Sequence, residues 1–167
     1  PSQSSAASDV YKRQTKKGLP MRQRKFPAAF IRGGTSNAIV FKEADLPPRE
    51  QWDAIFLAAI GSPDPYGRQL NGMGGGISSL SKVCVVGPPT HPDADIDYTF
   101  AQVSVQDATV DYGGNCGNMS SAMGPFAIDE GLVPSEGHEA RVRIHNTNTK
   151  KVIEARFPLD DGMAAVD

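Results

Sequence analysis

The alternation of apolar and polar residues predicts that most of this chain forms β-strands, with helices between some of them. The period of two that is typical of half-buried strands is clearest over 97–106, where Tyr98, Phe100 and either Val103 or Val105 are expected to face inward. Strands are expected at 26–32, 38–42, 83–86, 97–106, 139–147 and 151–157. The links at 33–37 and 146–150 are short and carry glycine, asparagine or threonine, which favours hairpins and antiparallel pairing.

Two segments have the spacing of helices instead. Residues 49–60 place Trp52 and Phe56 among apolar residues at helical spacing, and Gly61 provides a stop. These two aromatic residues are interpreted as core anchors. The run of small and apolar residues from 120 to 128 predicts a buried helix that ends at the next glycine.

The first residues do not fit this pattern. Pro1–Ser8 has little apolar content, and residues 9–14 resemble a translated sequencing adaptor. We therefore interpret 1–20 as a non-native or disordered leader, with Met21 as the expected native start, and exclude it from the fold.

Composition then narrows the class of protein. The 167 residues suffice for one domain or two small lobes, and a net charge of -2 without a basic run argues against nucleic-acid or membrane partners. The two cysteines, Cys84 and Cys116, form neither a disulfide framework nor a zinc motif, so a cytoplasmic location is expected. The three histidines lack ligand spacing, and we predict no metal.

The stretch 115–119 is the first candidate for chemistry. Asn115 and Cys116 follow a Gly-Gly break, and Gly117, Asn118 and Met119 open the predicted buried helix. A thiol in the first turn of a helix lies at the positive end of the helix dipole, beside unpaired amides that can also bind a carboxylate. The plain alternative is a small apolar side chain packed at a helix start.

A glycine-rich stretch from Asn71 to Lys82 is the second candidate. It lacks the glycine that a Walker loop places before its lysine, and it runs into a strand, unlike a dinucleotide fingerprint. What is left is a mobile, amide-rich loop that delivers Lys82 to the edge of a sheet. Ile77, Leu80 and Val83 favour its partial burial, and a desolvated lysine can act as a general base; the alternative is a solvated surface charge. Cys84, in an apolar strand, is expected to be inert core.

The link between the first two strands offers a third group. Arg32, Thr35 and Ser36 place a cation and two hydroxyls beside flexible backbone, which suits a carboxylate. The alternative is that this segment is only a turn.

Seven short motifs follow one another in order from Phe26 onward: Arg32-Gly33-Gly34-Thr35-Ser36, Gly61-Ser62-Pro63-Asp64, Gly72-x-Gly74-Gly75, Ser81-Lys82, Tyr98-x-Phe100-Ala101-Gln102-Val103, Asn115-Cys116-Gly117-Asn118-Met119 and Gly124-Pro125-Phe126-Ala127. Together they resemble the N-terminal half of the 2-methylaconitate cis-trans isomerase family, which includes 4-oxalomesaconate tautomerases. The chain departs from the family at Asn37-Ala38, where members commonly have Lys-Gly, and members are about twice as long.

The resemblance implies an α+β fold of the diaminopimelate-epimerase type, in which each of two lobes is a curled, mostly antiparallel sheet around a central helix. Residues 118–130 would be the central helix, and 21–167 the N-terminal lobe of a two-lobe isomerase whose C-terminal lobe is absent. The family's catalytic lysine and cysteine fall on Lys82 and Cys116. No cofactor is implied, and a homodimer of the longer protein is left open.

The implied reaction is isomerisation of an unsaturated di- or tricarboxylate. Lys82 would remove an allylic proton, and Cys116 would act as the opposing acid or position the substrate. The candidates for carboxylate binding are Arg32, Thr35, Ser36, Ser79, Ser81, Asn115, Gly117, Asn118 and Met119.

Two alternatives stay open. One is a non-catalytic carboxylate-binding module that uses the same amides. The other is a serine acyl-enzyme, since Ser79 and Lys82 match the Ser-x-x-Lys tetrad of penicillin-recognising enzymes, although no Ser-Asp-Asn or Lys-Thr-Gly follows.

Overall fold

The computed structural model describes residues 23–165, so the interpretation of 1–20 as a leader and of Met21 as a start falls outside the described residues. The strands are β1 (Ala29–Gly33), β2 (Ser36–Lys42), β3 (Lys82–Gly87), β4 (Ile96–Val103), β5 (Val110–Asp111), β6 (Glu139–Asn146), β7 (Lys151–Asp160) and β8 (Met163–Ala164). The α-helices are α2 (Trp52–Ile60) and α3 (Gly117–Asp129), and short 3₁₀ turns are η1 (Glu43–Asp45), η2 (Arg49–Gln51) and η3 (Ser78–Leu80). All six expected strands and both helices are confirmed. No helix within 23–165 has the length and apolar character needed to cross a membrane.

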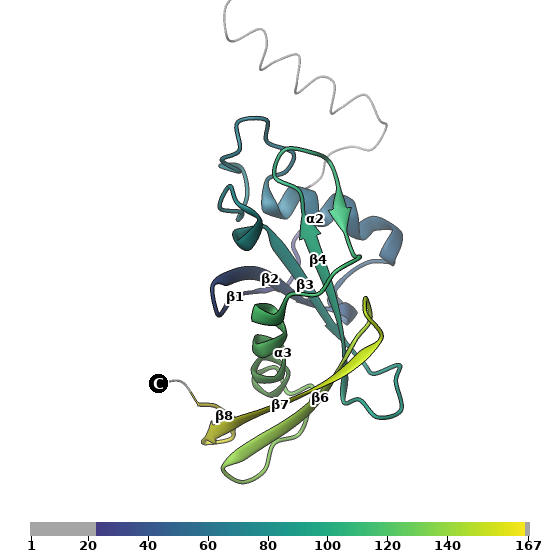
Figure 1. Ribbon diagram of the computed structural model, residues 1–167, viewed down its shortest axis with the longest axis vertical. Helices are drawn as coiled ribbons and strands as arrows, with labels where there is room; N and C mark the ends of the chain where they lie inside the picture. The colour runs from purple at the N-terminus through teal and green to yellow at the C-terminus, as the bar shows by residue number, and fades with distance from the viewer. Residues whose placement is uncertain (1–22, 166–167) are drawn as a thin grey trace, which may run out of the picture.

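The strands form one sheet in the order β1-β2-β3-β4-β6-β7-β8, with β5 paired to β4. Pairing is antiparallel except between β2 and β3 and between β4 and β6. The fold is therefore α+β with a mostly antiparallel sheet, as predicted. Figure 1 shows the sheet curling around α3, with the β6–β7 hairpin crossing below the helix.

The central strands β3 and β4 are buried on both faces, and this corrects the expectation for β4. Tyr98 and Phe100 pack toward α3, together with Met119 and Met123 of that helix. Val103 is also buried, but it belongs to the opposite face, where α2 packs. Alternation along β4 therefore separates two apolar faces and does not separate core from solvent.

Helix α2 closes the second face. Phe56 is fully buried and stacks on Phe41 of β2 with ring centroids 5.9 Å apart. Trp52 donates its indole N–H to the carbonyl of Pro47 at 2.9 Å. Gly61 ends the helix in the left-handed region (φ 86°), a conformation that glycine adopts without a steric penalty. The expected roles of Trp52 and Phe56 as core anchors are confirmed.

The segment between α2 and β3 was expected to be a mobile loop, but its hydrogen bonds hold it together around Gln69. This side chain is 1% exposed, accepts from the Gly76 amide at 2.8 Å and donates to the Ser62 hydroxyl at 2.9 Å. The Ser81 hydroxyl lies 2.8 Å from the same Gln69 oxygen. The loop therefore reaches β3 along a defined path.

The connection between β1 and β2 is shorter than expected. Gly33 and Ser36 are paired across the two strands, so the turn consists of Gly34 and Thr35 and not of five residues. Gly34 has a φ of 52°, which favours glycine at this position. The turn lies against the first residues of α3, and a methyl group on Gly33 would collide with the main-chain carbonyl of Asn118.

This contact predicts that Gly33→Ala destabilises the protein. The added methyl group meets backbone that cannot rotate away, so the free energy of unfolding should fall by about 1–3 kcal/mol. Gly114→Ala is the matched control, because a Cβ there meets nothing within 4 Å, and its change should stay within about 0.5 kcal/mol. Urea unfolding of the two variants measures both values, and equal stabilities would contradict the tight contact.

Candidate active site

Three chain segments meet at the N-terminal end of α3: the β1–β2 turn, the start of β3 and the residue that caps the helix. Side chains alternate along each strand, and Ala38 of β2, Cys84 of β3 and Phe100 of β4 all pack on the α3 face. By the same alternation, Ser36, Lys82 and Gln102 project on that face. The sheet therefore directs these polar side chains toward one end of the helix.

Cys116 is the N-cap of α3, with extended backbone angles (φ -114°, ψ 108°), and not a residue of its first turn as the sequence suggested. It is half-buried, and its Sγ lies 3.8 Å from the Ser36 hydroxyl. The Ser120 amide donates to the Cys116 carbonyl at 2.9 Å and begins the helical ladder. The amides of Gly117, Asn118 and Met119 precede that ladder, so the helix itself supplies them with no acceptor.

Asn118 joins the β1–β2 turn to the helix. Its side-chain amide donates to the Thr35 hydroxyl at 2.9 Å and lies 3.4 Å from the Ser36 hydroxyl. The structure thus brings together Thr35, Ser36, Cys116 and Asn118, four residues that the sequence analysis proposes for one site. Two hydroxyls, a thiol and the positive end of a helix dipole form a cluster with hydrogen-bond donors for an anion.

Lys82 lies at the first position of β3, an interior strand, and not at a sheet edge as expected. It is 8% exposed, and its Nζ donates to Gln102 Oε1 at 2.6 Å and lies 5.1 Å from the centroid of the Phe100 ring. Within 23–165 no carboxylate approaches it within ion-pair distance. The expected burial is confirmed, but Ile77 does not provide it, since that side chain is 55% exposed.

Gln102 is the residue that sequence reasoning missed. It is paired with Lys82 across β3 and β4, and its Nε2 donates to the carbonyls of Ser78 at 2.9 Å and Ser81 at 3.0 Å. Twenty residues separate it from Lys82 in the chain, so only the strand register brings the two together. Its place in the motif that contains Phe100 was the one signal in the sequence.

Cys84 lies beneath the candidate site and is fully buried. Burial raises the pKa of its thiol to about 12, an effect opposed by a hydrogen bond with the Tyr98 hydroxyl, while the nearby Cys116 raises it further and the nearby Lys82 lowers it. Burial likewise raises the pKa of Tyr98 above its usual range. The expectation that Cys84 lies in the core is confirmed. Lys82 lies two residues before it on the same face of β3, and Cys116 packs against the same core cluster, so the two lie on one side of the sheet.

Arg32 and Ser81 are not directed at this cluster. Arg32 is exposed and paired with Asn37, on strand positions that alternate away from α3. Ser81 is fully buried and occupied by Gln69 and the Ile77 carbonyl. Ser79 lies in the η3 turn, partly exposed, with no recorded hydrogen bond to Lys82 among the described residues.

The side chains of Asn115 and Met119 both stabilise the fold around the start of α3. The Asn115 side-chain oxygen accepts from Asn146 at 2.7 Å and from the Ser120 hydroxyl at 3.1 Å, which fixes the approach to the helix. The Met119 side chain is fully buried in the core, so only its main-chain amide is directed to the helix end. Asn146, fully buried, was not anticipated from the sequence.

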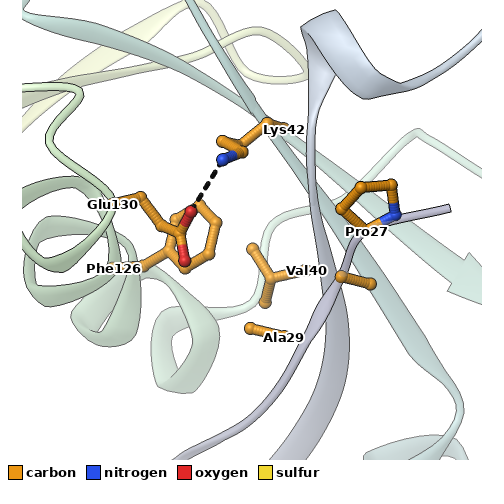
Figure 2. Close-up of a pocket in the computed structure, with 7 residues that line it drawn as sticks. Pro27, Ala29, Val40, Lys42, Phe126 and Glu130 are labelled. Carbon is orange, nitrogen blue, oxygen red and sulfur yellow. Dashed lines mark hydrogen bonds and ion pairs between the residues drawn. The ribbon is translucent and has the colours of Figure 1, made fainter.

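Two hollows border α3, one at each end. One of about 440 Å³ adjoins the cluster, where Asn115, Gly117 and Ser121 face β7. The other, of about 220 Å³, lies at the C-terminal end, beside an ion pair of 2.8 Å between Lys42 and Glu130 (Figure 2). None of the candidate residues lines the second hollow. Residues 23–165 contain no group of three or more metal-ligating side chains.

The fold belongs to the diaminopimelate-epimerase type. A probable proline racemase from Agrobacterium radiobacter K84 matches 84% of this chain at 14% identity with a TM-score of 0.55, over 39% of its own chain. A hydroxyproline epimerase from Agrobacterium vitis gives a TM-score of 0.54 at 13% identity, over 82% of this chain and 38% of its own. At this level of identity the likeness concerns the fold alone.

Within that class, the chain belongs to the PrpF protein family, whose pattern matches residues 23–167. It is 50% identical over 145 residues to a 3-methylitaconate isomerase from Eubacterium barkeri, and 47% identical over 150 residues to a 2-methyl-aconitate isomerase from Cupriavidus necator. These matches cover 86% and 84% of the chain but 38% of each relative. A methylitaconate-delta-isomerase crystal structure superposes with a TM-score of 0.81 at 50% identity, over 85% of this chain and 36% of that one.

The different burial of the two thiols makes a prediction about their reactivity. With a pKa of about 12, roughly one Cys84 thiol in ten thousand is ionised at pH 8, and the protein covers it as well. Iodoacetamide should therefore modify Cys116 first in the folded protein, as mapped by peptide mass. Cys116→Ser is the control in which Cys84 is the remaining cysteine, and this variant should be labelled at least about tenfold more slowly than the parent protein. Faster labelling of Cys84 than of Cys116 would contradict the assignment.

Proposed function

We propose that this chain carries half of the active site of a cofactor-independent isomerase that acts on unsaturated di- or tricarboxylates. The observation that carries the proposal is Lys82, a buried lysine held by a neutral oxygen on the same side of the core as Cys116. Relatives in the family are named as isomerases of 3-methylitaconate and 2-methyl-aconitate and as a 4-oxalomesaconate tautomerase, the last from Pseudomonas putida. Compounds of these three kinds are the first substrates to test.

The proposed reaction begins with proton transfer to Lys82. The neutral amine takes a proton from the carbon next to the double bond, and the electron pair of that C–H bond spreads into the alkene and a conjugated carboxylate. The resulting dienolate is reprotonated at the same carbon after rotation, which gives the geometric isomer, or at the other end, which shifts the double bond. No electrons are gained or lost, so the step requires no redox partner.

The end of α3 supplies the complementary charge. Main-chain amides of Gly117, Asn118 and Met119, with the helix dipole, would bind the carboxylate on which negative charge develops. Thr35 and Ser36 add hydroxyls already oriented by Asn118. Cys116, the N-cap of α3, would either return the proton from the opposite face or orient the substrate.

The serine acyl-enzyme alternative has less support. It needs Ser79 activated by Lys82, but Ser79 belongs to a 3₁₀ turn before β3, and the described hydrogen bond of Lys82 Nζ goes to Gln102 and not to Ser79. A fluorophosphonate probe that labels Ser79 would revive it. The carboxylate-binding module is separated from an isomerase by turnover itself.

We further propose that 21–167 is the N-terminal lobe of a two-lobe enzyme of the cytoplasm, with a second lobe closing over Lys82 and Cys116. The support is coverage, since the chain spans 38% of the length of the relatives named above. Sequencing the gene past the codon for Asp167 tests this. A following segment with the same sheet-and-helix pattern supports it, and an immediate stop codon contradicts it.

The proposal predicts that Lys82→Ala, in the protein with its second lobe, lowers kcat by about 10²–10⁴-fold, because a placed base contributes that much to proton transfer. Lys82→Arg should not restore activity, since a guanidinium stays protonated. Lys42→Ala is the matched control: this lysine lies on the same face of the sheet but pairs with Glu130 at the far end of α3. It should keep activity within about twofold.

The measurement is isomerisation of 3-methylitaconate or 2-methylaconitate, followed by proton NMR. Circular dichroism of each variant confirms that it is folded. If Lys82→Ala or Lys82→Arg is as active as the parent protein, Lys82 is not the base.

A further inference from the structure

We propose that Gln102 is a positioning residue that directs the lone pair of neutral Lys82 at the substrate. The inference rests on the proposed function, since it assigns a task to Gln102 only if Lys82 is a base. It adds a residue twenty positions away, on a different strand, that acts through the lysine and does not itself touch the reacting atoms.

Contacts at both ends of the Gln102 side-chain amide, its nitrogen and its oxygen, determine its orientation. Its Nε2 faces the carbonyl oxygens of Ser78 and Ser81, at 2.9 and 3.0 Å, and carbonyl oxygens only accept hydrogen bonds. Its Oε1 faces Nζ of Lys82 at 2.6 Å, and an ammonium group only donates. Rotating the amide by half a turn would set its oxygen against both carbonyl oxygens and leave those two contacts without a donor, whether Lys82 is protonated or neutral.

The two anchoring carbonyls belong to the chain that enters β3. The Ser81 carbonyl also accepts from the Val103 amide at 3.0 Å, so Gln102 and its neighbour hold the same peptide group. The backbone immediately before Lys82, the partner of its amine and strand β4 are thereby joined in one unit. This unit fixes where Nζ lies relative to the sheet.

A neutral lysine amine has two N–H bonds and one lone pair. If Gln102 Oε1 accepts one of the N–H bonds, the lone pair must point elsewhere, because an acceptor oxygen repels it. The Phe100 ring, 5.1 Å from Nζ, covers a further direction with its π electrons, which also disfavour the lone pair. The lone pair is therefore restricted to the remaining directions, and the inference is that the substrate carbon is bound in one of them.

An uncharged acceptor suits this task better than a carboxylate. Gln102 holds Lys82 in both its protonated and neutral forms, because the amide oxygen accepts an N–H bond from either. A carboxylate at the same position would favour the ammonium form and keep the base protonated. The described residues place no carboxylate within 4.0 Å of Lys82. The choice of glutamine at 102 is therefore explained by the chemistry of the lysine.

The test compares Gln102→Glu with Gln102→Met in the protein with its second lobe. Both variants lose the Nε2 donor to Ser78 and Ser81, so an effect of anchoring alone is common to them. Only Gln102→Glu adds a charge beside Lys82. Gln106→Glu is the matched control, because Gln106 is exposed and follows β4 in the chain.

We expect Gln102→Met to lower kcat about 10- to 100-fold with little change in KM, since the lone pair is no longer directed. In Gln102→Glu the ascending limb of the pH profile of kcat should move to higher pH by about one to three pH units, because the carboxylate stabilises the protonated lysine. In Gln102→Met and Gln106→Glu, the ascending limb of the pH profile of kcat should lie at the same pH as in the parent protein.

Each other result has a defined meaning when Lys82→Ala is measured beside these variants. An inactive Lys82→Ala together with equal pH profiles and equal losses in both Gln102 variants gives Gln102 a structural role only, and overturns this inference while the proposed function stands. A fully active Lys82→Ala removes the base, and the proposed function fails together with this inference. If Gln102→Met unfolds, Gln102→Leu takes its place in the kcat comparison, and a kcat equal to that of the parent protein overturns the inference.

Discussion

The close contact between the β1–β2 turn and the first residues of α3 is the constraint on which the candidate site depends. Gly33 leaves no room for a side chain between strand β1 and the Asn118 carbonyl. Because backbone meets backbone there, the turn brings Thr35 and Ser36 within hydrogen-bond reach of Asn118 and Cys116. Strand β2 then continues from the same turn and pairs with β3, so Ala38 lies beside Lys82. The contact between Gly33 and Asn118 thus fixes where Cys116 lies relative to Lys82, through strands β2 and β3.

The rest of the site follows from an apolar core that surrounds polar groups on one side. Helix α3 is buried along most of its length against the sheet face that carries Ala38, Cys84 and Phe100, and the sheet curls around the helix. At its N-terminal end this core gives way to Lys82, Ser36 and Cys116. Lys82 is nearly buried there and donates to an amide oxygen, not to a carboxylate. These are the surroundings from which we propose that it acts as the base.

Local features of the fold were predictable because local signals determine them. The hairpin of β6 and β7, the stop at Gly61 and the buried helix α3 all follow from periodicity and turn residues. The position of Lys82 inside the sheet could not be predicted, because the parallel pairing of β2 with β3 joins residues more than forty positions apart. The same holds for Gln102, which meets Lys82 only through the register of β3 and β4.

The length of the β1–β2 turn determines which candidate side chains face α3. A five-residue link left the direction of Arg32 undetermined, whereas the two-residue turn pairs it with Asn37 and places it away from α3. Ser81 is one of the residues that the sequence analysis lists as candidates for carboxylate binding. Its hydroxyl instead stabilises the loop around Gln69, a buried polar residue with a positive φ of 52° that no local pattern announced. Contacts between loops of this kind depend on the complete fold.

The central claim is that this lobe supplies the base of an allylic proton transfer. The most direct measurement is isomerisation in D₂O, in which the protein with its second lobe acts on 3-methylitaconate and the equilibrated mixture is analysed by NMR and mass spectrometry. The account predicts that deuterium enters the allylic carbon as isomerisation proceeds, because the protons on the Lys82 amine exchange with solvent between turnovers. An equilibrated mixture of isomers without deuterium would contradict proton transfer, and binding without isomerisation or deuterium would contradict catalysis of this reaction.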